Sequence, residues 1–466
     1  MLLNLKYYFL IFSFSFISTY VMFPLHINDK NFSSNDTPND FINKIIDSDL
    51  YILINIGSKN TSVRAFLDIY SNELRIGGEG IKLSKYNESI SDSYECIYCV
   101  NKEYYSGWYS EGVISTEDFY VLNSSNQYDL VHKMKFILGK KSIYINPPEG
   151  TCGLQLPLFN SEPDYNIINS LAKTGVINSY NWYLDYENFP YNNSKLIVDG
   201  FPHDLNNKKY NSENFISTQA TSIDEYINRY PLWALRFSDI YYNNISLNID
   251  YYKKFAKIQF NIGIIVAPEQ IVDILEKEFF EEYLNKNICF KVYLSINTYF
   301  YCKNTKEFDA RKFKDLSFKN VELSIIFKLG YKELFYSKGD YIYFLIIFRK
   351  VDEWIFGEIF LKKYHLVFNQ DLKSIGYYQD MENEDNNNNK SNGEDNNKGK
   401  DRNNFKLTLT NILLLLILLC IIIVSIVFYT KKGKRKNRAN ELDDDYEYKD
   451  SINEDKEAKE KNKIIE

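Results

Sequence analysis

The chain has 466 residues, 45% of them hydrophobic, which suffices for one large two-lobed domain or two ordinary domains with flanking segments. Its 40 tyrosines and 33 phenylalanines supply much of the apolar area that a core needs. The formal net charge is −7 and no basic stripe lies in the part expected to fold, so the composition gives no reason to expect nucleic-acid binding.

The N-terminus has the pattern of a secretory signal peptide, which we place at residues 1–20. Lys6 precedes an apolar run from Tyr7 to about Ile17. No clear small-x-small cleavage site follows, so an uncleaved signal-anchor is the alternative. Residues 21–48 are polar and low in hydrophobic periodicity, and we expect a leader outside the folded domain. With only Lys30 and Lys44 as cations after the signal, this leader is a poor match to a basic inhibitory prosegment.

From Tyr51 to about Tyr378 the chain reads as many short β-runs separated by Asn, Gly and Asp. Examples are YILINIG (51–57), KLIVDG (195–200), KIQFNIGIIV (257–266) and YIYFLIIFRK (341–350). Helical stretches are fewer, at 166–175 and 268–284. This distribution predicts a mainly β domain.

The C-terminal part predicts a membrane anchor. Residues 379–406 have almost no apolar content, so we expect a disordered stalk. Residues 411–430 carry no charge over about 20 positions, enough for a helix to cross about 30 Å of hydrocarbon. The basic run KKGKRKNR (431–438) follows at once and places the tail, 431–466, in the cytoplasm. A buried core helix fits this uniformly apolar run poorly. The predicted topology is type I, with the N-terminal domain lumenal or extracellular.

The six cysteines fit an oxidising compartment. Cys420 lies in the membrane segment, Cys96 and Cys99 form a C-x2-C, Cys289 and Cys302 are the second candidate pair, and Cys152 remains as a buried free thiol. A zinc site needs two more ligands near Cys96, and the nearest histidine in sequence is His132, so we expect no metal and no cofactor. Sequons on the proposed lumenal side agree with a glycoprotein: Asn31, Asn35, Asn60, Asn87, Asn123, Asn192, Asn244 and Asn389.

Several motifs of residues 51–186 resemble those of the pepsin-like aspartic proteases. Asp68-Ile69-Tyr70-Ser71 stands where the family has D-T-G-S after a strand and an I-G-T-P-like turn. Cys96 and Cys99 fall at the family's small disulfide loop. The segment 104–123 resembles its flap hairpin, which makes Tyr105 the candidate flap tyrosine. The stretch EGTCGLQLP, with Gly153, resembles D-G-I-L-G-L.

The second half continues the resemblance. WALRFSDI (233–240) is similar to W-x-V-x-L-D-S-I, and Cys289 and Cys302 match that lobe's disulfide. The most specific match is WIFGEIFLKKYHLVFNQDLKSIGY (354–377), with Gly357, to W-I-L-G-D-x-F-L-R-x-Y-x-V-F-D-x-x-x-x-x-I-G-F. The resemblance, together with the anchor, is to the membrane-anchored branch that includes apicomplexan plasmepsins. It implies a bilobal double β-barrel, with lobes at 49–225 and 226–378.

One departure from the family matters most. AKIQFNIGIIVAP (256–268) takes the place of A-I-V-D-T-G-T-S-L-I-V-G-P, so Gln259 stands where the second catalytic aspartate belongs. The threonines that hold the family's two loops together are replaced by Ile69 and Phe260, and Tyr70 replaces a glycine. Ser71 is expected to survive as a partner of Asp68.

The expected function is therefore a catalytically inactive homologue that binds a polypeptide in its cleft. Two alternatives stay open. One is an active aspartic endopeptidase that uses Asp68 with a non-standard partner. The other is a structural or sorting membrane glycoprotein whose protease fold is only a scaffold. For Asp68 itself we favour an ordinary turn or a satisfied buried carboxylate over a catalytic group.

Overall fold

The computed structural model describes residues 20–27, 36–46, 49–103, 111–142, 144, 146–156, 165–186, 194–220, 233–249, 254–322 and 325–379. These residues all lie within one compact unit, residues 1–389. The predicted signal peptide before Tyr20, the predicted stalk from residue 380, the predicted membrane segment 411–430 and the predicted tail lie outside the described residues, as does Tyr105. Within the described ranges, no helix is long and apolar enough to cross a membrane.

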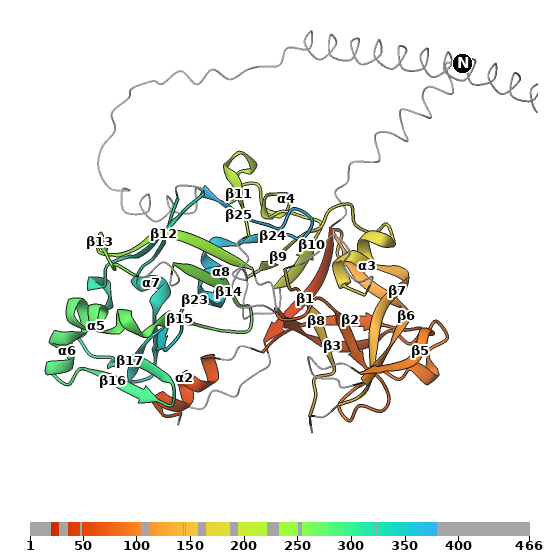
Figure 1. The fold of residues 1–466 in the computed structure, drawn as a ribbon, viewed down its shortest axis with the longest axis horizontal. Helices are drawn as coiled ribbons and strands as arrows, with labels where there is room; N and C mark the ends of the chain where they lie inside the picture. The colour runs from red at the N-terminus through yellow and green to blue at the C-terminus, as the bar shows by residue number, and fades with distance from the viewer. Residues whose placement is uncertain are drawn as a thin grey trace, which may run out of the picture. The chain divides into compact units, whose positions relative to one another are not determined.

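The described residues form two large, mainly antiparallel β-sheets (Figure 1). The first has 13 strands in the order β11-β25-β24-β9-β10-β1-β2-β3-β8-β4-β7-β6-β5. Its strands are β1 (Val21–Ile27), β2 (Leu50–Ile56), β3 (Thr61–Asp68), β4 (Leu74–Gly77), β5 (Glu95–Glu103), β6 (Glu111–Asn123), β7 (Tyr128–Lys141), β8 (Gly150–Gly153), β9 (Asn181–Asp185), β10 (Lys195–Val198), β11 (Phe215–Gln219), β24 (Val367–Asn369) and β25 (Ser374–Tyr378).

The second sheet has 12 strands, ten of them in the order β19-β18-β12-β14-β23-β15-β22-β17-β21-β20. They are β12 (Ala234–Tyr242), β14 (Phe255–Ile258), β15 (Ile265–Pro268), β17 (Asn297–Lys303), β18 (Leu316–Asn320), β19 (Ile326–Leu329), β20 (Phe335–Lys338), β21 (Tyr341–Phe344), β22 (Ile346–Arg349) and β23 (Trp354–Phe356), with β13 (Ile245–Ser246) beside β12 and β16 (Cys289–Leu294) beside β17.

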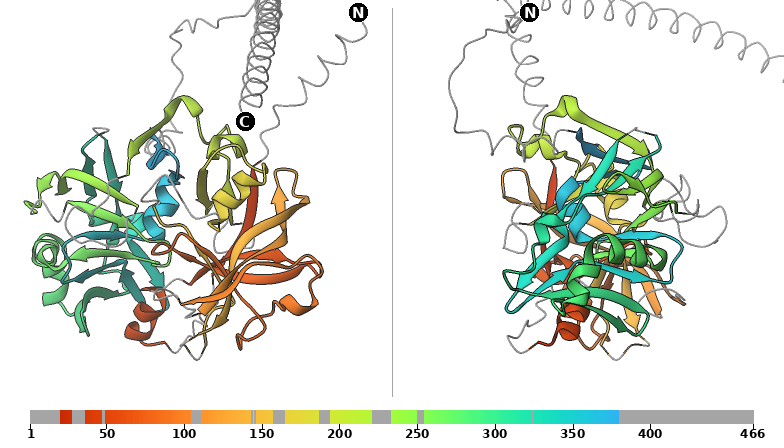
Figure 2. Two further views of the ribbon diagram at one scale, coloured as in Figure 1. Left: turned by 45° about the vertical axis from the view of Figure 1, so that its right-hand side comes forward. Right: turned by 90° about the vertical axis from the view of Figure 1, so that its left-hand side faces the viewer.

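The helices are short and lie around the sheets (Figure 2). The α-helices are α2 (Pro38–Ile46), α3 (Ile167–Lys173), α4 (Pro202–Leu205), α5 (Val272–Leu275), α6 (Glu281–Asn285), α7 (Tyr331–Leu334) and α8 (Glu358–Tyr364). Single turns are η1 (Glu88–Ile90), η2 (Ser212–Asn214), η4 (Glu269–Ile271), the π-turn η5 (Glu276–Phe280) and η6 (Ala310–Lys312). The helical stretches expected at 166–175 and 268–284 correspond to α3 and to the run from η4 to α6.

Alternation of side chains builds the sheets. In β2, Leu50, Ile52, Ile54 and Ile56 are buried while the residues between them are partly exposed. A period of two places all four on one face of a strand, so burial of that face sets the register against β3. The mainly β fold is thus confirmed.

The last two strands link the two sheets. β24 and β25 follow the second sheet in the chain, yet they pair with β9 and β11 of the first sheet. The range 226–378, expected to be the second lobe, therefore contributes strands to both sheets. This exchange ties the two halves together by backbone hydrogen bonds.

Residues 21–48, expected to be a polar leader, differ most from the prediction. The strand β1 pairs with β10, β2 and β6 inside the first sheet, and Val21, Met22, Phe23 and Leu25 are buried. The helix α2 buries Phe41, Ile42 and Ile46. These segments are part of the fold because each has an apolar face that neighbouring strands cover.

Both expected disulfides are present, Cys96–Cys99 and Cys289–Cys302, and Cys152 is free and buried in β8. Cys289 and Cys302 stand opposite each other in the β16–β17 ladder. We expect that replacing both by serine will lower the free energy of unfolding by about 2–4 kcal/mol, since the bridge closes a loop with a sequence separation of 13. Denaturant unfolding of the oxidised parent and the variant measures this difference. An unchanged midpoint would contradict it.

Candidate active site

The first candidate loop follows β3, which ends at Asp68. The strand β8 lies between β3 and β4, parallel to β3 and antiparallel to β4, with Asp68 opposite Gly153. The chain from residue 69 to 73 therefore crosses over β8. The backbone carbonyl of Asp68 accepts a hydrogen bond from the Leu154 N–H at 2.8 Å, which holds the end of β3 against the end of β8.

The second loop repeats this arrangement in the other sheet. The strand β23 lies between β14 and β15, parallel to β14 and antiparallel to β15. The Gln259 N–H donates to the Phe356 carbonyl at 3.0 Å, so Gln259 directly continues β14 alongside β23. Gly357, the next residue of the chain after β23, then lies beside Gln259 as Gly153 lies beside Asp68.

Contacts at Gly153 and Gly357 show that the Asp68 loop and the Gln259 loop are equivalent. A Cβ on Gly153 would lie 2.4 Å from the Ser71 carbonyl oxygen and from the Glu73 nitrogen, three and five residues after Asp68. A Cβ on Gly357 would lie 2.1 Å from the Ile262 oxygen and 2.3 Å from the Ile264 oxygen. Ile262 and Ile264 are likewise three and five residues after Gln259. Each loop thus passes over its glycine at the same two positions, which makes Asp68 and Gln259 counterparts.

Tyr70 connects the two counterparts. Its backbone N–H donates to Asp68 Oδ1 at 2.8 Å, and its hydroxyl reaches Gln259 Oε1 at 3.5 Å. The Gln259 amide in turn donates from Nε2 to Asn261 Oδ1 at 2.9 Å. Burial, followed by the nearby Asp68 and Glu353 carboxylates, raises the pKa of Tyr70. The phenol therefore stays protonated and keeps its role as a hydrogen-bond donor.

The electrostatic surroundings of Asp68 contain no sign of a carboxylate pair. Burial raises the pKa of Asp68, while the Tyr70 N–H and the charge of Arg75 act in the opposite direction. Among the described residues, no second acid contributes to this shift. A shared proton between two close carboxylates needs such a neighbour. Arg75 itself is buried and donates to Glu73 Oε2 from Nε at 2.7 Å.

Apolar packing occupies the place where the resemblance predicts hydroxyl contacts between the loops. Ile69 is buried, and the fully buried Phe260 ring packs edge-on against Trp182 of β9 and Phe368 of β24, with centroids 5.4 and 5.7 Å away. Trp233 joins this cluster and donates from its ring nitrogen to the Leu154 carbonyl at 2.8 Å. The Gln259 loop is thus attached to the first sheet by aromatic rings.

One predicted support is wrong. Ser71 does not serve Asp68; its hydroxyl accepts a hydrogen bond from the Glu73 N–H at 3.2 Å. A serine hydroxyl commonly bonds the backbone two residues on, and Ser71 makes that local turn with Glu73. Asn166 supports the loop from outside: it donates to the Asn72 carbonyl at 2.7 Å and caps α3 by accepting from Ile168 and Asn169.

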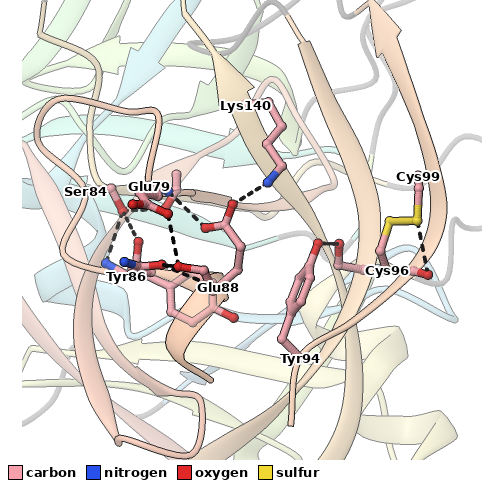
Figure 3. Close-up of polar contacts among 12 residues, drawn as sticks. Glu79, Ser84, Tyr86, Glu88, Tyr94, Cys96, Cys99 and Lys140 are labelled. Carbon is pink, nitrogen blue, oxygen red and sulfur yellow. Dashed lines mark hydrogen bonds and ion pairs between the residues drawn. A yellow bond between two sulfur atoms is a disulfide. The ribbon is translucent and has the colours of Figure 1, made fainter. Parts of the chain in front are cut away.

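A polar network braces the same lobe beside the β5–β6 hairpin (Figure 3). The Glu88 carboxylate is held by Lys140 and by the Glu79 N–H, the latter at 2.9 Å. Burial alone would raise the pKa of Glu88, but these hydrogen bonds outweigh it and lower the pKa. Tyr86 donates to the buried Glu117 of β6 at 2.6 Å, so the segment around η1 is fastened to β6 and β7.

Sequence reasoning placed Asp68 and Gln259 at equivalent positions of the two loops and Gly153 and Gly357 in the stretches that match the family's Gly motifs, but it noted Tyr70 only as the replacement of a glycine. The contact between Tyr70 and Gln259 depends on the direction in which the Tyr70 ring points, and no sequence motif specifies that direction. Within the described ranges, no group of three or more His, Cys, Asp or Glu side chains could hold a metal ion.

Comparison with known proteins adds evidence on the fold. No protein-family profile and no curated protein sequence matches the chain. Among solved structures, the chain is similar to basic 7S globulin from soybean, with a TM-score of 0.55 and 13% sequence identity. The match covers 77% of this chain and 94% of the globulin chain. At this identity the likeness shows the fold alone, and two large sheets matched to that pepsin-like protein are consistent with the bilobal pepsin-like fold.

Proposed function

We propose that this protein is a pepsin-like aspartic protease homologue that has lost catalysis and binds polypeptide between its two lobes. The observation that carries the proposal is that Gln259 is the counterpart of Asp68, with its amide oxygen reached by Tyr70. Extended peptides bind grooves between β-lobes through backbone hydrogen bonds, which need no catalytic acid, so binding can outlast catalysis.

The chemical argument concerns proton transfer. An aspartic protease shares one proton between two close carboxylates, one acting as base on a water molecule and the other as acid on the scissile carbonyl. A glutamine amide can orient a water but can neither take up nor return a proton. General acid–base catalysis contributes about 10²–10⁴ in rate, and here both roles lose a partner.

The proposed cellular location of the protein rests on the sequence pattern at its two ends. The signal peptide (1–20) and the anchor (411–430) indicate a single-pass type I protein of the secretory pathway, with its ligand on the lumenal or extracellular side. The Cys96–Cys99 and Cys289–Cys302 disulfides agree with an oxidising compartment.

An active endopeptidase is the second candidate. Burial raises the pKa of Asp68, which favours this candidate because a carboxyl that holds its proton more firmly is better suited to act as a general acid. A third class, a glycoprotein that uses the protease fold only as a scaffold, predicts neither cleavage nor peptide binding.

We expect the purified full chain to leave a peptide library uncut at acid pH, and Gln259→Asp to remain inactive. Restoring one carboxylate leaves Ile69 and Phe260 without hydroxyls, and Tyr70 still lies against position 259. Without those supports, two like charges would separate instead of sharing a proton.

Mass spectrometry of the library after incubation measures cleavage, with Asp68→Ala as the matched control. Cleavage by the parent that Asp68→Ala abolishes would establish the active endopeptidase. Peptide capture without cleavage supports the inactive homologue, while absence of both points to the scaffold.

A further inference from the structure

Tyr70 is the side chain of the Asp68 loop that points outward. Ile69, just before it, is buried with an exposed fraction of 3%, whereas Tyr70 is 46% exposed. The φ of Tyr70 is not positive, so its backbone conformation is open to residues other than glycine. The loop therefore carries a large ring at a position where the resemblance predicts no side chain.

The Tyr70 ring reaches from the Asp68 loop to the second sheet. Its backbone N–H donates to Asp68 Oδ1 at 2.8 Å, and its hydroxyl lies 3.5 Å from Gln259 Oε1. Gln259 is held in turn, because its N–H donates to the Phe356 carbonyl at 3.0 Å and its Nε2 donates to Asn261 Oδ1 at 2.9 Å. The ring thus lies between the two counterparts, Asp68 and Gln259.

The position of this ring limits how a polypeptide can lie over the two loops. In an active aspartic protease, the bond to be cut comes within hydrogen-bond reach of both carboxylates. Here the ring stands between Asp68 and Gln259, so a bound chain has to pass over it. Successive side chains of an extended chain point to opposite sides. One ligand side chain therefore points at Tyr70, and the ring limits its size.

We propose that Tyr70 determines which polypeptides bind: the protein takes extended segments that have glycine or alanine over the Tyr70 ring and rejects segments with a larger side chain there. This inference rests on the proposed peptide-binding function and names the ligand class of that site. Selection by a clash acts against the wrong ligand and needs no new attractive contact with the right one.

The bulk of the ring, and not its hydroxyl, makes the selection. The 3.5 Å from the hydroxyl to Gln259 Oε1 is long for an O–H···O hydrogen bond, for which about 2.7–2.8 Å is typical. This contact directs the ring toward the second sheet but adds little to holding it. Tyr70→Phe should therefore keep the selection, and Tyr70→Ala should abolish it.

The test uses a randomised octapeptide library and the full chain in lipid nanodiscs at neutral pH. Captured peptides are eluted, sequenced by mass spectrometry and aligned. With the parent, glycine and alanine should be enriched about tenfold over leucine and phenylalanine at one aligned position. With Tyr70→Ala that preference should disappear, and peptides with leucine or phenylalanine there should be captured as well. Tyr70→Phe should give the pattern of the parent.

Tyr293→Ala is the matched control. Tyr293 is 70% exposed and lies in β16, which belongs to neither loop. Its removal should leave the pattern of captured peptides unchanged. Circular dichroism of each variant checks that it is folded, and the pattern of the parent tests the inference without any variant.

Each outcome decides between the two proposals. Captured peptides with no small-residue position in the parent, or with the same preference in Tyr70→Ala, would overturn the selection by Tyr70 and leave the proposed function standing. Loss of the preference in Tyr70→Phe would overturn it too, because the ring remains in that variant. Capture by Tyr70→Ala alone would make the ring a block and not a selector. No capture by the folded parent or by any folded variant would reject the proposed function itself.

Discussion

Replacing Gly357 by alanine is expected to cost at least about 4 kcal/mol of unfolding free energy, a large part of the roughly 5–15 kcal/mol typical of a folded domain. The new methyl group would lie 2.1 Å from the Ile262 oxygen and 2.3 Å from the Ile264 oxygen. Both are backbone atoms of the loop that carries Gln259, so relief requires moving the loop away from β23. Denaturant unfolding of parent and variant measures the loss.

Gly339→Ala provides a matched control. No atom lies within 4 Å of a Cβ placed there, and only its φ of 57° opposes alanine. A penalty of about 1 kcal/mol follows from that backbone conformation. If Gly357→Ala were no more destabilising than Gly339→Ala, the crossing of the Gln259 loop over Gly357 would be wrong.

The strands and both loops could be predicted because their determinants are local. The alternation in β2 follows from burial of one face of the strand, and it is visible in the sequence. Gly153 and Gly357 stand where a backbone passes too closely to leave room for a side chain, and they too are visible in the sequence. The two disulfides could be predicted from cysteine count and spacing for the same reason.

The helix α2 and the strand β1 were not predicted, for physical reasons. Residues 21–27 adjoin the apolar run of the predicted signal peptide and contain Pro24, which argues against a central strand. α2 is only nine residues long, too short for a clear helical period. One signal was available: Thr37 and Asp40 bond each other's backbone N–H, the reciprocal arrangement of a capping box, directly before Phe41 and Ile42.

In the candidate site, motifs predict the identity of the two key residues but not the contacts around them. Residue identity at positions 68 and 259 follows from aligned motifs, and it settles which groups can exchange a proton. The bridge from Tyr70 to Gln259 and the ring cluster around Phe260 depend on contacts between strands far apart in the chain. Those contacts put apolar packing where the resemblance predicts hydroxyl bonds between the loops, so Gln259→Asp alone changes the chemistry without adding support.

The second large effect is expected from pH. His365 is buried with a φ of 44°, and its ring lies edge-on to Tyr210. Burial, followed by the positive charge of Lys209, lowers the pKa of His365 to about 3. An unfolded histidine has a pKa of about 6.5, so the unfolded chain binds this proton first as pH falls. The stability that depends on the neutral ring is complete above about pH 6.5 and is lost progressively toward pH 3.

The expected loss is about 2 kcal/mol at pH 5 and approaches roughly 4–5 kcal/mol near pH 3. Asp68 and Glu358 act in the opposite direction, because burial raises the pKa of each and protonation then favours the folded state. The test therefore compares variants and not the parent alone. His365→Asn keeps a residue that tolerates positive φ and removes the proton site.

We expect His365→Asn to be less stable than the parent at pH 7.5 and to lose that disadvantage, or reverse it, by pH 5. His132→Asn, at a histidine whose side chain is largely exposed, should follow the parent at both pH values. Unfolding free energies at several pH values measure the difference, which parallel curves for His365→Asn and the parent would refute. The result also bears on function: if acid weakens the fold through His365, failure to cut peptides at acid pH is informative only where circular dichroism shows the chain still folded. The cleavage assay should therefore begin near pH 6 and descend only while that signal holds.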